Sequence, residues 1–293
     1  MMPQFLFIIL TITCLAISSH QQALAGAWTQ KKGHFYSKIS LLRFESSSQY
    51  LLNGDRERLA DNGKVLDLGF YYYQEYGLYD NLTFITSLSF KKLNFSCVTS
   101  GCDHTSTGLG DIYGGFRYRL SQKSWIVSVQ SGVKIAPGYQ ANEEQLNSAP
   151  PLGDGQTDFD FHFLLGRPIL NYHGYINLDF GYRARSSEPV DEIPFAFEFG
   201  VNLTKNYLLI GQVYGIRSIT EKQGQQDFRV TDGMVLNFIG TGAVEDFLKA
   251  QVQLIYHINF WFDLSFVFEQ VLAGRNTSRA SILGGGVRVA FHK

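Results

Sequence analysis

The chain has 293 residues, of which 17% are charged and 15% aromatic, and its formal net charge is −1. The near-neutral balance gives no reason to expect nucleic acid as a partner. After residue 25 no run of about 18 apolar residues occurs, which excludes helical membrane spans and leaves a β-barrel as the only spanning structure.

The first 25 residues are predicted to be a secretory signal peptide. Residues 5–17 form a short apolar core, and Ala23-Leu24-Ala25 supplies a small-x-small cleavage site before Gly26. No Lys or Arg precedes the apolar core, so a retained N-terminal anchor is the alternative. We therefore expect a mature chain of residues 26–293 that forms a single barrel domain.

Alternation of apolar and polar residues runs through most of the mature chain. About twelve segments of roughly nine to twelve residues show it, the length that a tilted transmembrane strand needs. The predicted strands are residues 34–44, 65–76, 82–90, 111–120, 125–135, 158–165, 175–185, 195–203, 207–216, 248–256, 262–271 and 280–291. The sequence thus predicts an all-β fold, a transmembrane antiparallel up-and-down barrel of about twelve strands.

The connections between the predicted strands alternate in length. The short ones are residues 77–81, 121–123, 168–174, 204–206 and 257–260. The long, polar ones are residues 46–64, 94–108, 136–156, 186–194, 216–244 and 272–279. This asymmetry is typical of outer-membrane barrels, in which short turns and both chain termini face the periplasm.

Aromatic residues gather near the short turns, where an interfacial girdle is expected. They are Tyr76, Tyr79, Trp125, Tyr172, Tyr175, Tyr207, Phe260 and Trp261. A soluble β-sandwich or a lipocalin-like barrel is the alternative fold, because alternation alone does not tell whether the apolar face points inward or outward.

Two cysteines of the mature chain lie close together in the second long connection. Cys97 and Cys102 are predicted to form a small disulfide that stiffens this loop in an oxidising compartment. The alternative is a metal ion bound by this pair with His104 nearby, which would need further ligands.

The last strand carries an assembly signal. Gly286, Val289 and Phe291 fit a Gly-x-x-apolar-x-aromatic pattern that is similar to the one read by the barrel-assembly machinery, although two residues follow the terminal aromatic. The expected location is therefore the bacterial outer membrane. The expected partners there are the assembly machinery, outer-membrane lipid and lipopolysaccharide, and a small solute.

With the apolar faces assigned to lipid, the lumen receives charges of both signs. A hairpin that closes symmetrically around residues 168–174 brings carboxylates opposite guanidiniums. The predicted opposite pairs are Asp158 with Arg185, Asp160 with Arg183, and His162 with Gly181. Together with the inward Arg117 and Arg119, these charged residues either neutralise one another in a crowded barrel or form the constriction of a pore.

Other sites are possible on the same residues. Asp111 after Gly110, and Asp154 between Gly153 and Gly155, could bind a cation, but turn chemistry explains the Gly and Asp equally well. Asp158, Asp160 and His162 could activate water as a barrel hydrolase does, although they occupy only one wall. A structural or adhesive barrel is a further alternative, and neither a cofactor nor a resident metal is expected.

Four stretches carry a family resemblance. They are Gly26-Ala27-Trp28-Thr29-Gln30 with Lys32-Gly33, Tyr76-Gly77-Leu78-Tyr79-Asp80-Asn81-Leu82-Thr83, Gly108-Leu109-Gly110-Asp111, and Gly153-Asp154-Gly155-Gln156-Thr157-Asp158. Together they resemble the outer-membrane β-barrel family of the MetA pathway of phenol degradation, a group of transporters. The resemblance implies a barrel and passive import of small molecules, including hydrophobic or aromatic compounds, without enzymatic activity. It transfers no binding residue.

Overall fold

The computed structural model describes residues 26–98, 103–137, 152–153, 155–169, 173–186, 190–219 and 244–291. Its strands in chain order are β1 (Phe35–Tyr50), β2 (Arg56–Arg58), β3 (Lys64–Tyr79), β4 (Leu82–Ser96), β5 (His104–Gln122), β6 (Ile126–Ile135), β7 (Asp158–Ile169), β8 (Gly174–Arg185), β9 (Glu192–Asn202), β10 (Tyr207–Ser218), β11 (Asp246–His257), β12 (Phe262–Arg275) and β13 (Thr277–Phe291). A 3-10 turn, η1 (Ala60–Asn62), precedes β3. Among the described residues, no helix is long and apolar enough to cross a membrane.

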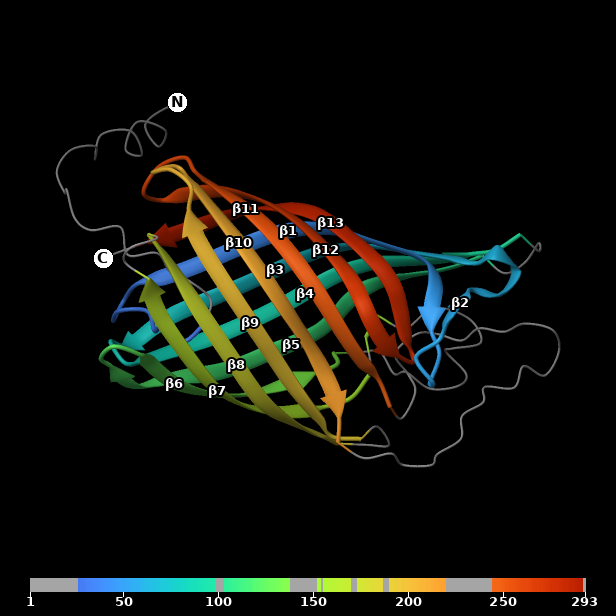
Figure 1. Cartoon of the computed structure of the whole chain (residues 1–293), viewed down its shortest axis with the longest axis horizontal. Coiled ribbons are helices and arrows are strands. Elements are labelled where there is room, and N and C mark those ends of the chain that lie inside the picture. Colours follow the sequence, from blue (N-terminus) through green and yellow to red (C-terminus); the bar gives the residue numbers. More distant parts are fainter. Residues whose placement is uncertain are drawn as a thin grey trace, which may run out of the picture.

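The sheet closes on itself. Each long strand pairs antiparallel with its neighbours in sequence, and β13 pairs with β1 from Phe35 opposite Phe291 onward (Figure 1). Short β2 pairs with the outer end of β1, so the other strands of the 13-stranded sheet form a closed barrel of twelve. Closure gives each of the twelve long strands a hydrogen-bonded neighbour on both sides, which a barrel in lipid requires. The predicted all-β, up-and-down architecture is confirmed.

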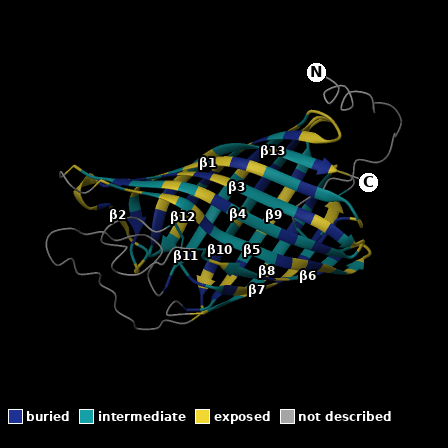
Figure 2. Ribbon diagram, turned by 180° about the vertical axis from the view of Figure 1, so that it is seen from behind, coloured by how far each residue is buried: buried dark blue, intermediate teal, exposed yellow. Residues whose placement is uncertain are grey.

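The apolar side chains point outward. Phe159 and Phe161 are 55% and 52% exposed, whereas Asp158 and Asp160 between them on β7 are 0% and 6% exposed. The same alternation of buried and exposed residues covers the whole barrel wall (Figure 2). An apolar exterior around a polar interior is the arrangement of a membrane barrel. The alternative of a soluble sandwich or a lipocalin-like barrel is therefore wrong.

Several strands continue past the predicted loop boundaries. Residues 46–64 and 94–108 were expected to be irregular, but β1 runs to Tyr50, β4 runs to Ser96 and β5 begins at His104. In Figure 1 the hairpins of β3, β4 and β5 extend beyond the other strands at the end of the barrel that carries the long connections. The backbone hydrogen bonds between strands continue there, but the residues of these extensions are mostly polar or small, so the alternation of apolar and polar residues that marks a membrane strand is weak.

Most of the described residues predicted for the aromatic girdle are exposed near the short turns, and their place at a membrane interface stays a prediction. Tyr79, Tyr207 and Trp261 are exposed near the short turns, and the Trp261 ring lies 4.9 Å from that of Phe291. Tyr175, predicted to belong to the girdle, is only 2% exposed and lies inside the lumen, because it alternates with outward-facing neighbours on β8. Tyr172 lies outside the described residues.

Three further predictions concern residues at the edge of the described chain. Cys97 is disulfide-bonded. Cys102 lies outside the described residues, so its pairing with Cys97 stays a prediction, as does the signal peptide in residues 1–25. The described chain begins and ends at the same, short-turn end of the barrel, since Phe35 pairs with Phe291. The assignment of that end to the periplasm also stays a prediction.

We expect Phe266→Arg to lower the free energy of unfolding by about 2–4 kcal/mol, because it places a charge on the lipid-facing surface. Phe266 is 63% exposed on β12, in the middle of its outward apolar positions. The measurement is urea-induced unfolding in lipid vesicles. Thr105→Arg, at an exposed position of the β5 extension, is the control and should cost less than about 1 kcal/mol. Equal losses of unfolding free energy in the two variants would mean that Phe266 does not face lipid.

Candidate functional site in the barrel lumen

Charged side chains of β7 and β8 face each other across the hairpin inside the barrel. The register pairs Asp158 with Arg185 and Asp160 with Arg183, as the sequence predicts. Arg183 Nε lies 2.8 Å from Asp160 Oδ1, and Arg185 Nε lies 3.6 Å from Asp158 Oδ1. Both carboxylates and the Arg185 side chain are almost completely buried, so these pairs are weakly screened.

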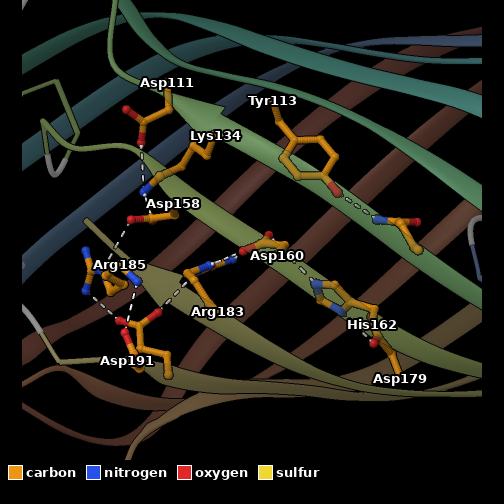
Figure 3. Close-up of polar contacts among 12 residues, drawn as sticks. Asp111, Tyr113, Lys134, Asp158, Asp160, His162, Asp179, Arg183, Arg185 and Asp191 are labelled. Atoms are coloured by element: carbon orange, nitrogen blue, oxygen red, sulfur yellow. Dashed lines mark hydrogen bonds and ion pairs between the residues drawn. The ribbon is translucent and has the colours of Figure 1, made fainter.

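The pairing continues onto neighbouring strands on both sides. Lys134 of β6 lies 2.6 Å from Asp158 and 3.6 Å from Asp111 of β5. Glu192 of β9 accepts from Arg185 at 2.6 Å and from Arg183 at 3.1 Å. Figure 3 shows the labelled members of this network converging from adjacent strands. Five strands therefore share one charged surface on the lumen wall.

His162 extends the network toward the short-turn end. Its Nδ1 lies 2.7 Å from Asp179 Oδ1, and its Nε2 lies 3.7 Å from Asp160 Oδ2 (Figure 3). Gly181 stands opposite His162, as predicted, and leaves room for the imidazole ring. The predicted opposite pairs did not include Lys134, Asp179 or Glu192, and Glu192 fell in a predicted loop. Glu192 and Glu198 are separated by an even number of residues on β9, so their side chains point to the same face, and this alternation could have placed Glu192 in the lumen.

We call this network the ion-pair ladder. Its members are Asp111, Lys134, Asp158, Asp160, His162, Asp179, Arg183, Arg185 and Glu192. Five carboxylates face three permanent cations and one histidine, so the ladder carries an excess of two negative charges when the histidine is neutral and one when it is protonated. A lumen wall of this kind attracts cations and polar groups that carry positive charge.

The two other arginines predicted for this site lie elsewhere. Arg117 binds Glu75, with Nη1 2.9 Å from Oε1, in a separate buried cluster nearer the short turns. Arg119 is beside the turn at Asn81, where its backbone N–H donates to the Asn81 carbonyl oxygen. Neither makes one of the ion pairs of the ladder among the described residues. Arg117 and Arg119 are two residues apart on β5, so their side chains point to the same face of the strand. This alternation does not tell how far along the barrel axis each residue lies.

A segment of chain ahead of β1 enters the lumen at the short-turn end. We call residues 26–32 the N-terminal segment. Ala27 is 1% exposed, and its carbonyl oxygen accepts from Ser128 Oγ of β6. Arg117 Nη1 donates to the Trp28 carbonyl oxygen at 3.0 Å, so the segment is bound by its backbone to the inner wall.

Side chains fix the N-terminal segment further. Gln30 Nε2 donates to Glu75 Oε2 at 2.7 Å, and the Gln30 backbone N–H donates to Thr83 Oγ1 at 2.8 Å. The Trp28 ring packs edge-on against Tyr175 with centroids 5.7 Å apart. A side chain at Gly77 would collide with the segment's backbone, so the glycine permits this close approach. The alternation of residues gave no sign of this segment, although it contains one of the family-like motifs.

The part of the lumen wall formed by β10 and β11, which we call the aromatic wall, carries aromatic side chains beside a lysine. On β10 and β11, Lys249 Nζ lies 4.5 Å from the ring centroid of Phe247 and 5.7 Å from that of Tyr214. Its ammonium also pairs with Glu269 of β12 at 3.4 Å. On β3, Tyr71 lies beneath Lys91 at 6.0 Å. In the order of strands around the barrel, β10 follows directly on β9 of the ladder, whereas β3 lies on another side of the lumen.

Metal binding and hydrolysis have little support in this geometry. Within the described ranges, no group of three or more His, Cys, Asp or Glu side chains is arranged to hold a metal ion. Asp111 pairs with Lys134, and Asp154 lies outside those ranges. Asp158, Asp160 and His162, the candidate hydrolase residues, are all engaged in ion pairs with neighbours.

No family model matches the sequence, and no curated protein matches it either. Among solved structures, the chain is similar to the COG4313 outer membrane channel from Pseudomonas putida F1, with 13% identity and a TM-score of 0.66 over 90% of this chain and 98% of that one. It is also similar to the translocator domain of the autotransporter NalP from Neisseria meningitidis, with 10% identity and a TM-score of 0.48 over 90% of each chain. The first similarity establishes the outer-membrane barrel fold. The resemblance to the phenol-degradation family itself is not confirmed.

We expect Asp158→Asn to lower the free energy of unfolding by about 3 kcal/mol, because it leaves Lys134 and Arg185 without their shared buried carboxylate. Urea titration of the refolded barrel measures this change. Glu45→Gln is the control, since the Arg43–Glu45 pair is about half exposed on the outer surface and should contribute less than about 1 kcal/mol. A cost below 1 kcal/mol for Asp158→Asn would mean that water already screens the ladder.

Proposed function

We propose that this protein is an outer-membrane channel for the passive uptake of small molecules. The observation that carries the proposal is a closed barrel with an apolar exterior and a polar lumen in which charges of both signs line the wall. A barrel filled only for stability has no need of so many buried charges, since apolar packing usually serves stability as well. A polar interior is what a solute pathway requires.

The proposed orientation places the short turns and both termini in the periplasm and the long connections outside the cell. The exposed aromatic residues at the short turns and the terminal aromatic Phe291 support it. The barrel-assembly machinery and outer-membrane lipid, including lipopolysaccharide, are the partners that this location implies. Gly286, Val289 and Phe291 remain the proposed assembly signal.

The proposed solutes are small hydrophobic or aromatic compounds that also carry a polar group. Aromatic rings in the lumen, Tyr71 on β3, Tyr214 on β10 and Phe247 on β11, offer stacking surfaces, while the ion-pair ladder offers hydrogen bonds. The apolar part of such a molecule can move from one ring to the next along the lumen while its polar group keeps hydrogen bonds to charged side chains. Twelve strands enclose a lumen only moderately wider than one filled by side chains, which restricts passage to small solutes.

The N-terminal segment is proposed to close the periplasmic end of this pathway. It crosses the inner surface between β3, β5, β6 and β8, where Glu75, Arg117, Ser128 and Tyr175 bind it. After the predicted cleavage before Gly26, the segment would continue into the barrel wall at one end, through residues 33–34. Solute passage would therefore be controlled by how often the segment leaves these contacts.

A barrel hydrolase is the competing function, and a structural or adhesive barrel is another. The hydrolase would need a water-activating carboxylate or histidine, but the candidates are held by cations or by other carboxylates. A purely structural barrel would explain the ladder but not the aromatic wall with its lysine. We therefore favour the channel.

We expect deletion of residues 26–32 from the mature chain to increase single-channel conductance in a planar bilayer, because it removes the backbone that lies across the lumen. The full-length barrel should show small or rare openings under the same conditions. Lys205→Ala, in a short turn at the same end, is the control and should behave like the full-length barrel. Equal conductance of the deleted and full-length chains would show that the segment does not limit passage.

We expect Asp160→Ala to lower the ratio of cation to anion permeability by about fivefold at low salt, since one unit charge about 8 Å away through water favours a cation and disfavours an anion by about 0.5 kcal/mol each. Arg183→Ala should raise the ratio by a similar factor. Reversal potentials across a salt gradient measure both. Unchanged selectivity in the two variants would remove the ladder from the conduction pathway.

A further inference from the structure

The mature chain would begin against the lumen wall. The backbone of Gly26 has φ +141°, and a Cβ there would collide with the side-chain amide of Asn177 on β8. Only glycine adopts this conformation without strain, and only glycine fits in this space. Two residues later, Trp28 packs on Tyr175, two positions from Asn177 on the same strand. The first residues of the segment therefore lie beside the inward face of β8.

A carboxylate lies next to this point. Glu198 of β9 stands opposite Asn177 in the register, and its Oε1 accepts from Tyr175 Oη at 2.8 Å and from Asn177 Nδ2 at 3.3 Å. The two residues that bind Glu198 are thus the same two that contact Gly26 and Trp28.

Glu198 is partly buried, and no Lys, Arg or His nitrogen in the described part of the chain forms an ion pair with it within 4.0 Å. Lys38 influences it electrostatically from farther away. A carboxylate removed from water is costly unless a cation compensates it. The lumen therefore has a negative site at the place where the mature chain would begin.

We propose that removal of residues 1–25 creates the cation for this site: the new α-ammonium of Gly26 pairs with Glu198 and anchors the N-terminal segment in the lumen. In this hydrolysis one water molecule is added across the peptide bond between Ala25 and Gly26, which leaves a carboxylate on Ala25 and an ammonium on Gly26. The proposal rests on the predicted cleavage site and on the proposed closing role of the segment.

Processing then has a structural effect on the barrel. Before cleavage the Gly26 nitrogen is a neutral amide with one N–H donor and no charge. After cleavage the same nitrogen carries a charge and three donors, and hydrogen bonds from charged donors to a carboxylate are about twice as strong as neutral ones. The precursor would hold the segment weakly, whereas the mature barrel would hold it firmly.

The test compares four exported proteins: the unchanged chain, a chain with three serines inserted between Ala25 and Gly26, Glu198→Gln, and the combination. The insertion keeps the cleavage motif but moves the new ammonium away from Gly26. Hydrogen–deuterium exchange of residues 27–32 reports the closed segment directly. We expect the insertion and Glu198→Gln each to accelerate this exchange about tenfold. The combination should be no faster than either single change.

Glu269→Gln is the matched control, because this lumen carboxylate on β12 pairs with Lys249 and does not contact the segment. It should leave exchange in residues 27–32 unchanged. Slow exchange after the serine insertion, or additive effects of the two changes, would overturn the ion pair. N-terminal sequencing of the unchanged exported chain must give Gly26, and any other first residue would also overturn it. Exchange does not depend on conductance, so a silent channel would contradict the proposed function and leave this inference standing.

Discussion

The fold depends on one requirement, that every backbone N–H and C=O within the membrane finds a partner inside the protein. The backbone hydrogen bonds between β13 and β1 close the sheet and so meet this requirement. Closure in turn imposes alternation of the two side-chain faces on every strand. Apolar side chains then face lipid, and each residue between them must face the lumen. The charged interior follows from this geometry, because a lumen that admits water can hold residues that a packed core would reject.

The same alternation explains why so much of the barrel was accessible from the sequence. Parity and the centre of one short turn were sufficient to pair Asp160 with Arg183, and the structure has that register. Parity failed where the membrane no longer imposes it, as in the extensions of β4 and β5. It also says nothing of height along the barrel, which is why Arg117 was grouped with the ladder although it binds Glu75. The N-terminal segment is not a strand, so no periodic signal could reveal it.

Charged side chains in the lumen are stabilised in two ways. Along β5 to β9 the carboxylates and guanidiniums neutralise one another across neighbouring strands, and several ions pair with two partners, as Glu192 does with Arg183 and Arg185. Along β10 and β11 a single lysine is stabilised instead by aromatic rings and one carboxylate. The first arrangement is polar over its whole surface, whereas the second presents apolar ring faces. A narrow lumen can in this way serve solutes of mixed character.

The glycine at position 77 has a consequence for how this barrel can change during evolution. Its bare backbone lies directly against the N-terminal segment, so any side chain there would have to displace it. Position 77 belongs to β3, whose ladder to β1 and β4 is formed independently of the segment. A single codon change could therefore open the lumen while leaving the wall intact. Under the proposed uptake function, cells in which uptake limits growth would have access to a more permeable barrel through one mutation, and cells exposed to small toxic molecules would be under selection to retain the glycine.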